Sequence, residues 1–397
     1  MTNVKFHFHL NDIDKVYLQI NIKKDLNLDI EYMNNSEFIK LRNIKDKIFN
    51  SRKWDMNKKF SNDYELIHIP NKRNRVESIA LYQPLSRSYF KMIEIIKEFD
   101  LINTNQEDKF ISCHLAEGPG GFMEACYNVS HQLGFKYYKH HGITLYSCNK
   151  DIPGWSKAYD FIRNDKNINI SYGFDNTGNL YRSENIRYFK DIDVGNEKAN
   201  LVTADGGFDF SIDFNKQEQL SYRLIFCEIV TALSVQRIGG HFVCKLFDLY
   251  TNASIKLIYF VCCFYKDIYL YKPLTSRPAN SEKYLICKNF KGINKEYLEQ
   301  LLEVIKIWDN IPESIFINDI FKGKIPEYFI KKIKDYNKNN SSNQIKNIEK
   351  TINLINKPKN LEDLNLIIEK QIDCAIQWCK KYNQDVNYRS SFIKNRN

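Results

Sequence analysis

The sequence has no apolar run long enough to cross a bilayer, which argues against a membrane-spanning protein. Its longest apolar stretch, Ile255 to Tyr265, contains Lys256 and is followed by Lys266. The first residues, MTNVKFHFHL, show no apolar segment after a basic region, so we expect no secretory leader. We therefore expect an intracellular protein, and the sequence does not distinguish the nucleus from the cytoplasm or a viral replication compartment.

Paired cysteine motifs and internal repeats are also missing. The 10 cysteines include two close pairs, Cys262 with Cys263 and Cys374 with Cys379, and these do not form paired CxxC motifs. No repeat period is visible, which argues against a repeat architecture. We expect reduced, buried thiols and no metal site.

Basic charge and aromatic rings, in contrast, are abundant. The formal net charge is +10, and the chain has 25 Tyr and 26 Phe. A basic surplus favours polyanionic partners, with nucleic acid before an anionic membrane, although solubility alone explains it equally well. Lys72, Arg73, Arg75 and the segment 52–59 are candidate phosphate contacts, with a solvated charged face as the alternative.

Residues 85–290 alternate short apolar segments with helical ones, which is typical of βαβ units and a mainly parallel sheet. The region after residue 294 shows helical spacing, then a polar stretch at 337–343 that we interpret as a loop, then two more helical runs. We expect strands at 110–115, 142–146, 200–204, 240–246, 267–272 and 283–287, and helices at 87–99, 121–133, 218–237 and 252–264.

A glycine-rich segment, Glu117-Gly118-Pro119-Gly120-Gly121-Phe122, follows one expected strand and opens a helix. Glycines there let the backbone turn tightly and approach a ligand closely. The pattern is neither GxGxxG nor GxxxxGK[ST], so a dinucleotide or a triphosphate is a less favoured ligand. A compact turn of this kind suits the amino-acid end and ribose of S-adenosylmethionine, and a βα turn without a ligand is the alternative.

Charged residues interrupt or follow several of the apolar strands. Asp205 ends one strand, and ligands of open α/β sheets bind outside the carboxyl ends of the strands. Lys245 lies in an otherwise apolar strand, where it must be paired, neutral or at the strand's end. Glu282 directly precedes a strand, and Lys91 lies on the first helix. Each alone is explained equally well by a surface position, but the Lys-Asp-Lys-Glu order beside a GPGG loop is far more specific.

With these stretches the chain resembles the FtsJ-type (RrmJ-like) ribose 2′-O-methyltransferases, and within them the eukaryotic-type cap-specific mRNA enzymes. The matching segments are EGPGGF (117–122), ADGGF (204–208), GGHFVCKLFDLYT (239–251) and KPLTSRPANSEKYLICK (272–288). The resemblance implies an α/β, Rossmann-like S-adenosylmethionine-dependent methyltransferase fold at 81–293, with a mainly parallel sheet flanked by helices. We expect residues 1–80 to form an N-terminal extension, which is a candidate region for contacts to RNA or the cap, and residues 294–397 to form a helical C-terminal extension.

The resemblance also implies roles for individual residues. Asn179 stands where the family commonly has Asp. The implied catalytic residues are Lys91, Asp205, Lys245 and Glu282; the cofactor contacts are Ser86, Ala116, Glu117, Gly118, Pro119, Gly120, Gly121, Phe122, Asp175, Asn179, Leu180 and Asp205; and the substrate contacts are Asn215, Arg277, Asn280 and Arg73.

The implied reaction is methyl transfer to the ribose 2′-hydroxyl of the first transcribed nucleotide of capped mRNA, with capped RNA as partner and no membrane. Our hypothesis is that Lys245, made partly neutral by burial and by Lys91, accepts the hydroxyl proton or directs its lone pair. Asp205 would oppose this lowering of the Lys245 pKa, so we expect it to serve in orientation and in placing the cofactor, and Glu282 would hold Lys91 or Lys245. Trp54 and Trp155 are candidates for stacking on the cap.

Two alternatives remain open at this point. The first is an FtsJ-like ribose methyltransferase of rRNA or tRNA, with the same chemistry on another RNA. The second is a catalytically silent RNA-binding subunit, against which the complete set of four charged residues argues. The sequence predicts no particular protein partner.

Overall fold

The computed structural model describes residues 5–8, 19–25, 36–48, 51–70, 77–104, 108–149, 152–208, 214–312, 314–356 and 360–394. The predicted phosphate contacts Lys72, Arg73 and Arg75 lie outside these ranges. No helix in the described ranges has both the length and the apolar character needed to cross a membrane.

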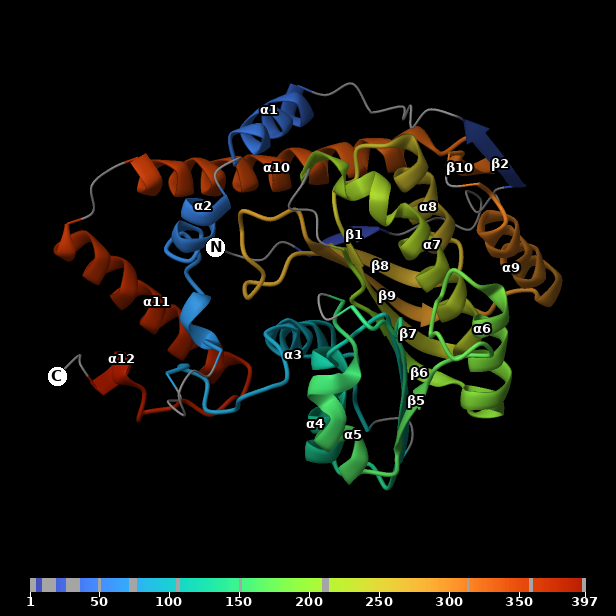
Figure 1. Cartoon of the computed structure of the whole chain (residues 1–397), viewed down its shortest axis with the longest axis horizontal. Helices are drawn as coiled ribbons and strands as arrows, with labels where there is room; N and C mark the ends of the chain where they lie inside the picture. The colour runs from blue at the N-terminus through green and yellow to red at the C-terminus, as the bar shows by residue number, and fades with distance from the viewer. Residues whose placement is uncertain are drawn as a thin grey trace.

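A mixed sheet runs through the centre of the molecule (Figure 1). Its strand order is β1-β8-β9-β7-β6-β3-β4-β5. The strands from β5 to β7 in this order are parallel, whereas β9 is antiparallel to both β7 and β8, and β1 is antiparallel to β8. The predicted α/β class with a mainly parallel sheet is confirmed. The strands are β1 (Phe6–Phe8), β3 (Lys109–Leu115), β4 (Tyr137–Ile143), β5 (Ile168–Ser171), β6 (Ala199–Ala204), β7 (Gln236–Leu246), β8 (Tyr265–Tyr271) and β9 (Lys283–Phe290).

Helices cover both faces of this sheet, because successive side chains of a buried strand point to opposite sides. In β6, Val202 belongs to one half of the core and Leu201 to the other. The first half packs under α7 (Gln217–Val235), α8 (Asn252–Cys262) and α9 (Lys295–Asp309), and the second under α3 (Ser88–Phe99), α4 (Gly121–Leu133) and α11 (Leu361–Lys381).

The long helix α10 (Glu327–Asn356) runs through the stretch 337–343, so the predicted loop there is wrong. Its polar side chains are satisfied without breaking the helix. Asn337 donates to the carbonyl of Leu249 at 2.7 Å, and Gln344 to that of Ala279 at 3.2 Å. Ser341 bonds back to the Asn337 carbonyl at 2.6 Å. A polar helix face that binds core backbone therefore looks like a loop when only hydrophobicity is considered.

The segments before and after the central fold pack on each other. Strand β2 (Gln19–Asp25) pairs with β10 (Phe316–Lys322) in a separate two-stranded sheet that the sequence did not predict. Trp54 is buried against Leu41 and Ile348, so its predicted role in stacking on a cap is wrong. The remaining helices are α1 (Ser36–Lys45), α2 (Ser51–Asn57), α5 (Tyr159–Asn164), α6 (Ser183–Tyr188) and α12 (Ser391–Lys394), with short 3-10 turns at 46–48, 65–67, 155–158, 195–197 and 214–216 and a π turn at 189–194.

A buried carboxyl group joins helix α11 to the core by a hydrogen bond. Glu94 of α3 accepts hydrogen bonds from Trp378 Nε1 at 3.0 Å, Tyr271 OH at 2.7 Å and the Leu274 backbone N–H at 2.7 Å. Burial raises the pKa of Glu94, and these hydrogen bonds oppose the rise. The C-terminal helix and the start of the 272–282 loop are thereby joined to the helix that carries Lys91.

Candidate active site

The order of the strands explains why three of the four predicted catalytic residues lie close together. Asp205 comes directly after β6, Lys245 is the second-last residue of β7, and Glu282 directly precedes β9. In the sheet Lys245 lies opposite Tyr284, and the residue before Asp205 lies opposite the residue before Lys245. The three side chains therefore meet at the edge formed by the carboxyl ends of β6 and β7, where ligands of such sheets bind.

Asp205 and Lys245 form an ion pair. Lys245 Nζ lies 3.3 Å from Asp205 Oδ1 and donates to the Asp205 carbonyl oxygen at 2.7 Å. Tyr284 OH donates to the same carboxylate oxygen at 2.9 Å. The Lys245 and Asp205 side chains are only 12% and 14% exposed. Asp205 is thus held from two sides, and it fixes the direction of the lysine.

Glu282 and Lys91 form the second ion pair of the site. Lys91 reaches from α3 to place its Nζ 2.7 Å from Glu282 Oε1, and Ser276 Oγ donates to that oxygen at 2.9 Å. Of the two lysines that Glu282 was predicted to hold, the structure places it in contact with Lys91. The positive charge of Lys245 also acts on the Glu282 carboxylate, so this carboxylate links the two lysines.

The protonation of Lys245 differs from the prediction. Burial favours the neutral amine, but the carboxyl groups of Asp205, Glu282 and Glu228 outweigh it and raise the pKa of Lys245 above its ordinary value. The hypothesis of a partly neutral Lys245 is therefore wrong for the free protein, because it set only Asp205 against burial and Lys91, whereas Glu282 and Glu228 also raise the pKa of this lysine.

The Glu282 ion pair makes stability depend on acid pH. Burial alone would raise the pKa of Glu282, but Lys91 and Lys245 lower it from 4.5 to about 2. A carboxyl group whose pKa is lower in the folded state contributes stability above the unfolded value, and this is lost as the pH falls toward the folded value. We expect the free energy of unfolding of the natural protein to fall more steeply between pH 4.5 and 2 than that of Glu282→Gln. Urea titrations across this pH range measure both slopes, and equal slopes would contradict the assignment.

The glycine-rich loop joins β3 to α4 and lies against the start of α3. Gly120 has a φ of +104°, in the left-handed region that favours glycine. A Cβ at Gly121 would overlap the hydroxyl groups of Ser86 and Ser88, which lie 2.5 Å from each other. Ser86 therefore lies directly against the glycine-rich loop, and its predicted contact with the cofactor stays a prediction.

Filling the space at Gly121 is expected to block the cofactor. We expect Gly121→Val to weaken S-adenosylmethionine binding by roughly tenfold to a hundredfold, because the new side chain pushes the loop away from Ser86. Isothermal titration calorimetry measures the loss. Gln132→Val, at the other end of α4, is the matched control, since Gln132 is an exposed helical residue away from the loop. Unchanged affinity in Gly121→Val would separate this loop from cofactor binding.

Three predicted cofactor contacts have side chains that point into the core. The Glu117 carboxyl accepts a hydrogen bond from Thr203 Oγ1 and lies 3.2 Å from His114 Nδ1, and burial raises its pKa well above the ordinary value. Phe122 and Leu180 are buried in the two halves of the core. Of these residues, only the backbone is placed to meet a ligand. The sequence motif identifies the positions but not the direction of the side chains.

Asp175 and Asn179 shape a turn after β5. Asp175 Oδ1 accepts hydrogen bonds from the N–H and hydroxyl of Thr177 at 3.0 and 2.6 Å. Asn179 Oδ1 accepts one from the backbone N–H two residues later at 2.9 Å. The N–H of Tyr146 donates to the Thr177 carbonyl at 2.7 Å, so the turn adjoins the end of β4. These predicted contacts therefore lie on the same sheet edge as the glycine-rich loop.

A cavity of about 1080 Å³ opens between this edge and the glycine-rich loop. Pro119, Tyr146, Trp155 and Tyr172 line it, and the Trp155 ring packs against Gly120. Gly207 leaves room beside Lys245, since a Cβ there would lie 3.1 Å from Nζ. Tight glycine turns next to an aromatic cavity fit S-adenosylmethionine, which has a narrow amino-acid end and a flat adenine ring. Trp155 is 8% exposed, lines this cavity and packs against the loop, and its predicted stacking on a cap stays a prediction.

The predicted substrate contacts all have partners within the chain where the structure describes them. Arg277 binds both carboxylate oxygens of Glu65, at 2.8 and 3.1 Å. Asn215 Nδ2 donates to Asp46 Oδ1 at 2.6 Å. Asn280 Oδ1 accepts from Lys272 Nζ at 2.7 Å. Arg73 lies outside the described residues. To contact RNA, each of these three side chains must either release its partner within the chain or use a polar atom that this partner does not occupy.

Sequence reasoning missed several polar residues of the site. Tyr284 holds Asp205, Ser276 holds Glu282, and Lys272 donates to the Glu282 carbonyl at 2.6 Å. Burial lowers the pKa of Lys272 to about 7, with Glu282 opposing this and Lys283 and Lys91 adding to it. Strand alternation gave a signal for Tyr284, which is two residues after Glu282 and so on the same face.

Comparison with known proteins adds to this geometry. Residues 84–290 match the family described as FtsJ-like methyltransferase. Cap-specific mRNA (nucleoside-2'-O-)-methyltransferase 1 of Bos taurus is 32% identical over 316 residues, which are 72% of this chain and 36% of the relative. The Mus musculus protein of that name is 38% identical over 259 residues, 59% of this chain and 30% of the relative. The chain thus spans about a third of the length of these relatives.

Proposed function

Because the chain belongs to the FtsJ-like methyltransferase family, we propose that it transfers the methyl group of S-adenosylmethionine to the 2′-hydroxyl of the first transcribed nucleotide of capped mRNA, forming cap 1. The observation that carries the proposal is the meeting of two lysine–carboxylate pairs, Lys245 with Asp205 and Lys91 with Glu282, beside the glycine-rich loop. The names of the related cap-specific enzymes support capped mRNA as the substrate.

In this proposal the cofactor supplies an electrophilic methyl group, and the chain's residues place the ribose oxygen in line with it. Ser86, Gly120 and Gly121 hold the donor at the sheet edge. Lys245, directed by Asp205, contacts the 2′-oxygen and stabilises the negative charge that develops there. A protonated Lys245 can take the hydroxyl proton only after it has lost its own. A further positive charge nearby, such as the donor's sulfonium, would favour that loss by opposing the carboxylates that raise the pKa of Lys245.

Glu282 and Lys91 complete the pocket for the ribose. Because Glu282 binds Lys91 directly and interacts with the charge of Lys245, it sets the distance between the two ammonium groups. Asn215, Arg277 and Asn280 are the proposed contacts to RNA, together with Arg73. Basic contacts to phosphate make the affinity for RNA fall with salt.

The test is methyl transfer from labelled S-adenosylmethionine to matched capped and uncapped RNAs, followed by nuclease mapping of the labelled nucleotide. Label in the ribose of the first nucleotide, on capped RNA alone, is the expected result. Equal transfer to rRNA or tRNA without a cap would replace the proposal by another ribose methyltransferase. Binding of the cofactor and RNA without any transfer would point to a silent subunit.

A further inference from the structure

A second cavity, of about 150 Å³, lies outside the cofactor region. It is open on one side and is lined by α10, by Phe6 of β1, by the segment 61–64 and by the 272–278 part of the loop that precedes Glu282. Engineered cavities of about this size take a single aromatic ring. Helix α10 lies outside the part of the chain that matches the family, so nothing in that match assigns a role to this cavity.

An asparagine stripe on α10 forms one wall of the cavity. Tyr336, Asn340, Asn343 and Asn347 recur at spacings of four, three and four residues, which places them on one helix face, and Asn339 lies beside them. Within the described ranges, the side-chain amides of Asn339, Asn340 and Asn343 form no hydrogen bond. This wall therefore presents free amide donors and acceptors to an occupant.

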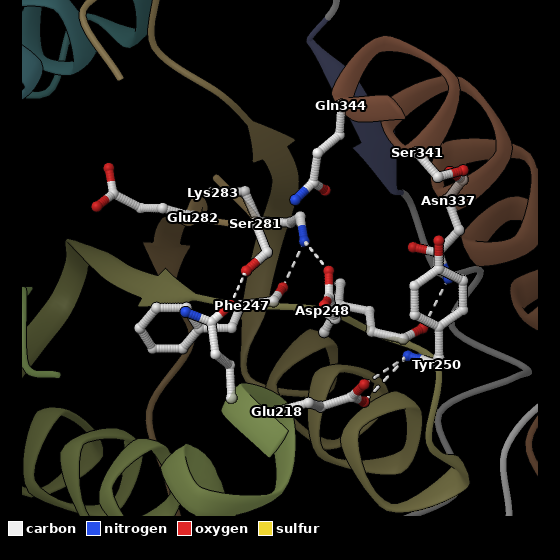
Figure 2. A network of polar contacts seen from close by, with 12 residues as sticks. Glu218, Phe247, Asp248, Tyr250, Ser281, Glu282, Lys283, Asn337, Ser341 and Gln344 are labelled. Carbon is white, nitrogen blue, oxygen red and sulfur yellow. Dashed lines mark hydrogen bonds and ion pairs between the residues drawn. The ribbon is translucent and has the colours of Figure 1, made fainter. Parts of the chain in front are cut away.

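The neighbouring face of α10 holds this stripe in place. Asn337 and Gln344 are bonded to the backbone of Leu249 and Ala279, as the fold requires, and both belong to the face next to the stripe. Figure 2 shows Asn337 and Gln344 pointing from α10 toward the two segments that hold Asp248 and Lys283. The helix that carries the stripe is thus anchored to the loops that follow Lys245 and precede Glu282.

The cavity and the site of methyl transfer share a wall. Ser276 lines the cavity and also donates to the catalytic Glu282 carboxylate. Lys272 lines it and donates to the Glu282 backbone carbonyl. An occupant would therefore lie one side chain away from the residues that surround the reacting ribose.

The lining favours a neutral, planar, polar ligand. Lys272 Nζ already binds three oxygen atoms, so it does not offer a phosphate site. Asp63 is the one carboxylate in the lining, and it is paired with Lys370 at 2.9 Å. The remaining surface combines amides with the rings of Phe6, Tyr64 and Tyr336, with Leu274 and with prolines. Unpaired RNA bases are recognised by this combination of edge hydrogen bonds and stacking.

We propose that this cavity binds one unpaired base of the RNA, from a nucleotide next to the one that is methylated. The inference rests on the proposed function and extends it, since it makes helix α10 part of the RNA-binding surface. It assigns to Asn340 and Asn343 the contacts to the base edge, and to Tyr64 a ring face.

The test uses the full chain with short capped RNAs in which each of the first nucleotides after the methylated one is made abasic in turn. For the natural protein, one abasic position should raise the KM for RNA about tenfold without changing kcat, as expected for the loss of one base contact. Asn340→Ala/Asn343→Ala should raise the KM for intact RNA by a similar factor and be insensitive to that abasic position. Asn353→Ala, an exposed asparagine on the same helix outside the cavity, is the matched control.

The outcomes separate this inference from the proposed function. If the natural protein methylates capped RNA but no abasic position changes KM, the cavity is not a base site, and the proposed function stands. The same holds if the double variant keeps the natural KM. Thermal melting of each variant shows whether folding is preserved, and a raised KM that keeps its abasic sensitivity would also overturn the inference. No transfer by the natural protein to capped RNA would instead refute the proposed function.

Discussion

Replacing Lys245 by alanine is expected to lower the rate of methyl transfer by about 10³-fold, while the affinity for S-adenosylmethionine changes by less than about twofold. The reason is geometric. Lys245 Nζ is directed by the Asp205 carboxylate and carbonyl toward the sheet edge where the ribose would lie, whereas the glycine-rich loop and Ser86 belong to other elements. Single-turnover transfer to capped RNA and calorimetric titration of the cofactor measure the two quantities.

The matched control for this variant is Lys266→Ala. Lys266 is an exposed lysine of β8, remote in the sheet order from β6, and its loss should leave both quantities unchanged. Transfer by Lys245→Ala at the natural rate would remove Lys245 from the mechanism. A parallel loss of cofactor affinity would show that Lys245 supports the donor rather than the ribose.

The second large effect concerns stability. Asp248→Ala is expected to lower the free energy of unfolding by about 3–5 kcal/mol, because it leaves buried positive charge without its partner. Asp248 Oδ2 lies 2.5 Å from Lys45 Nζ, and Lys283 Nζ lies 4.0 Å from Asp248 Oδ1. The Lys45 side chain is 4% exposed and that of Lys283 1%. Figure 2 shows Lys283 between the Phe247 carbonyl, to which it donates, and Asp248.

Urea denaturation at neutral pH measures this change. The matched control is Asp55→Ala, which removes an ion pair with Lys58 in which Asp55 is 61% exposed. Exposed pairs contribute little, so its effect should stay below about 1 kcal/mol. If the two variants lose similar free energy of unfolding, Asp248 does not pair with buried positive charge in the way that its contacts with Lys45 and Lys283 indicate. Since Lys45 comes from α1 and Lys283 follows Glu282 directly, Asp248→Ala should also lower the rate of transfer.

The fold was largely predictable because its strands are short, apolar and bounded by helical segments. Every predicted strand and helix of the region 85–290 has a counterpart in the structure, and the match to the FtsJ-like family covers 84–290. The largest shift among them is β4, which begins at Tyr137 rather than at residue 142. The start of this strand was not predicted because Tyr137–His141 is rich in polar residues. Such residues are tolerated there because β4 lies near the sheet edge, with only β5 beyond it.

The errors at 337–343 and at Trp54 have a common physical cause. The residues that contact a side chain in the folded protein can lie far from it in sequence, so the local sequence does not reveal them. The stretch 337–343 was interpreted as a loop because its asparagines and serines have no apolar neighbours in sequence. In the structure Asn337 and Gln344 bind backbone carbonyls from loops far away in the chain. Trp54 is buried for the same reason, since its cover comes from α10.

The sequence by itself determined the elements of the central fold, the glycine turn at 118–121 and the identity of the four charged residues Lys91, Asp205, Lys245 and Glu282. Local periodicity is enough for the elements and the turn, because they depend on near neighbours in the chain, whereas the four charged residues lie far apart in the chain and their catalytic roles are implied by the family resemblance. Only the tertiary structure decided which lysine pairs with which carboxylate, that Lys245 keeps its proton in the free protein, and that the side chain of Glu117 faces inward. Charge states and side-chain directions depend on distances between separate strands and helices, and those distances exist only once the chain has folded.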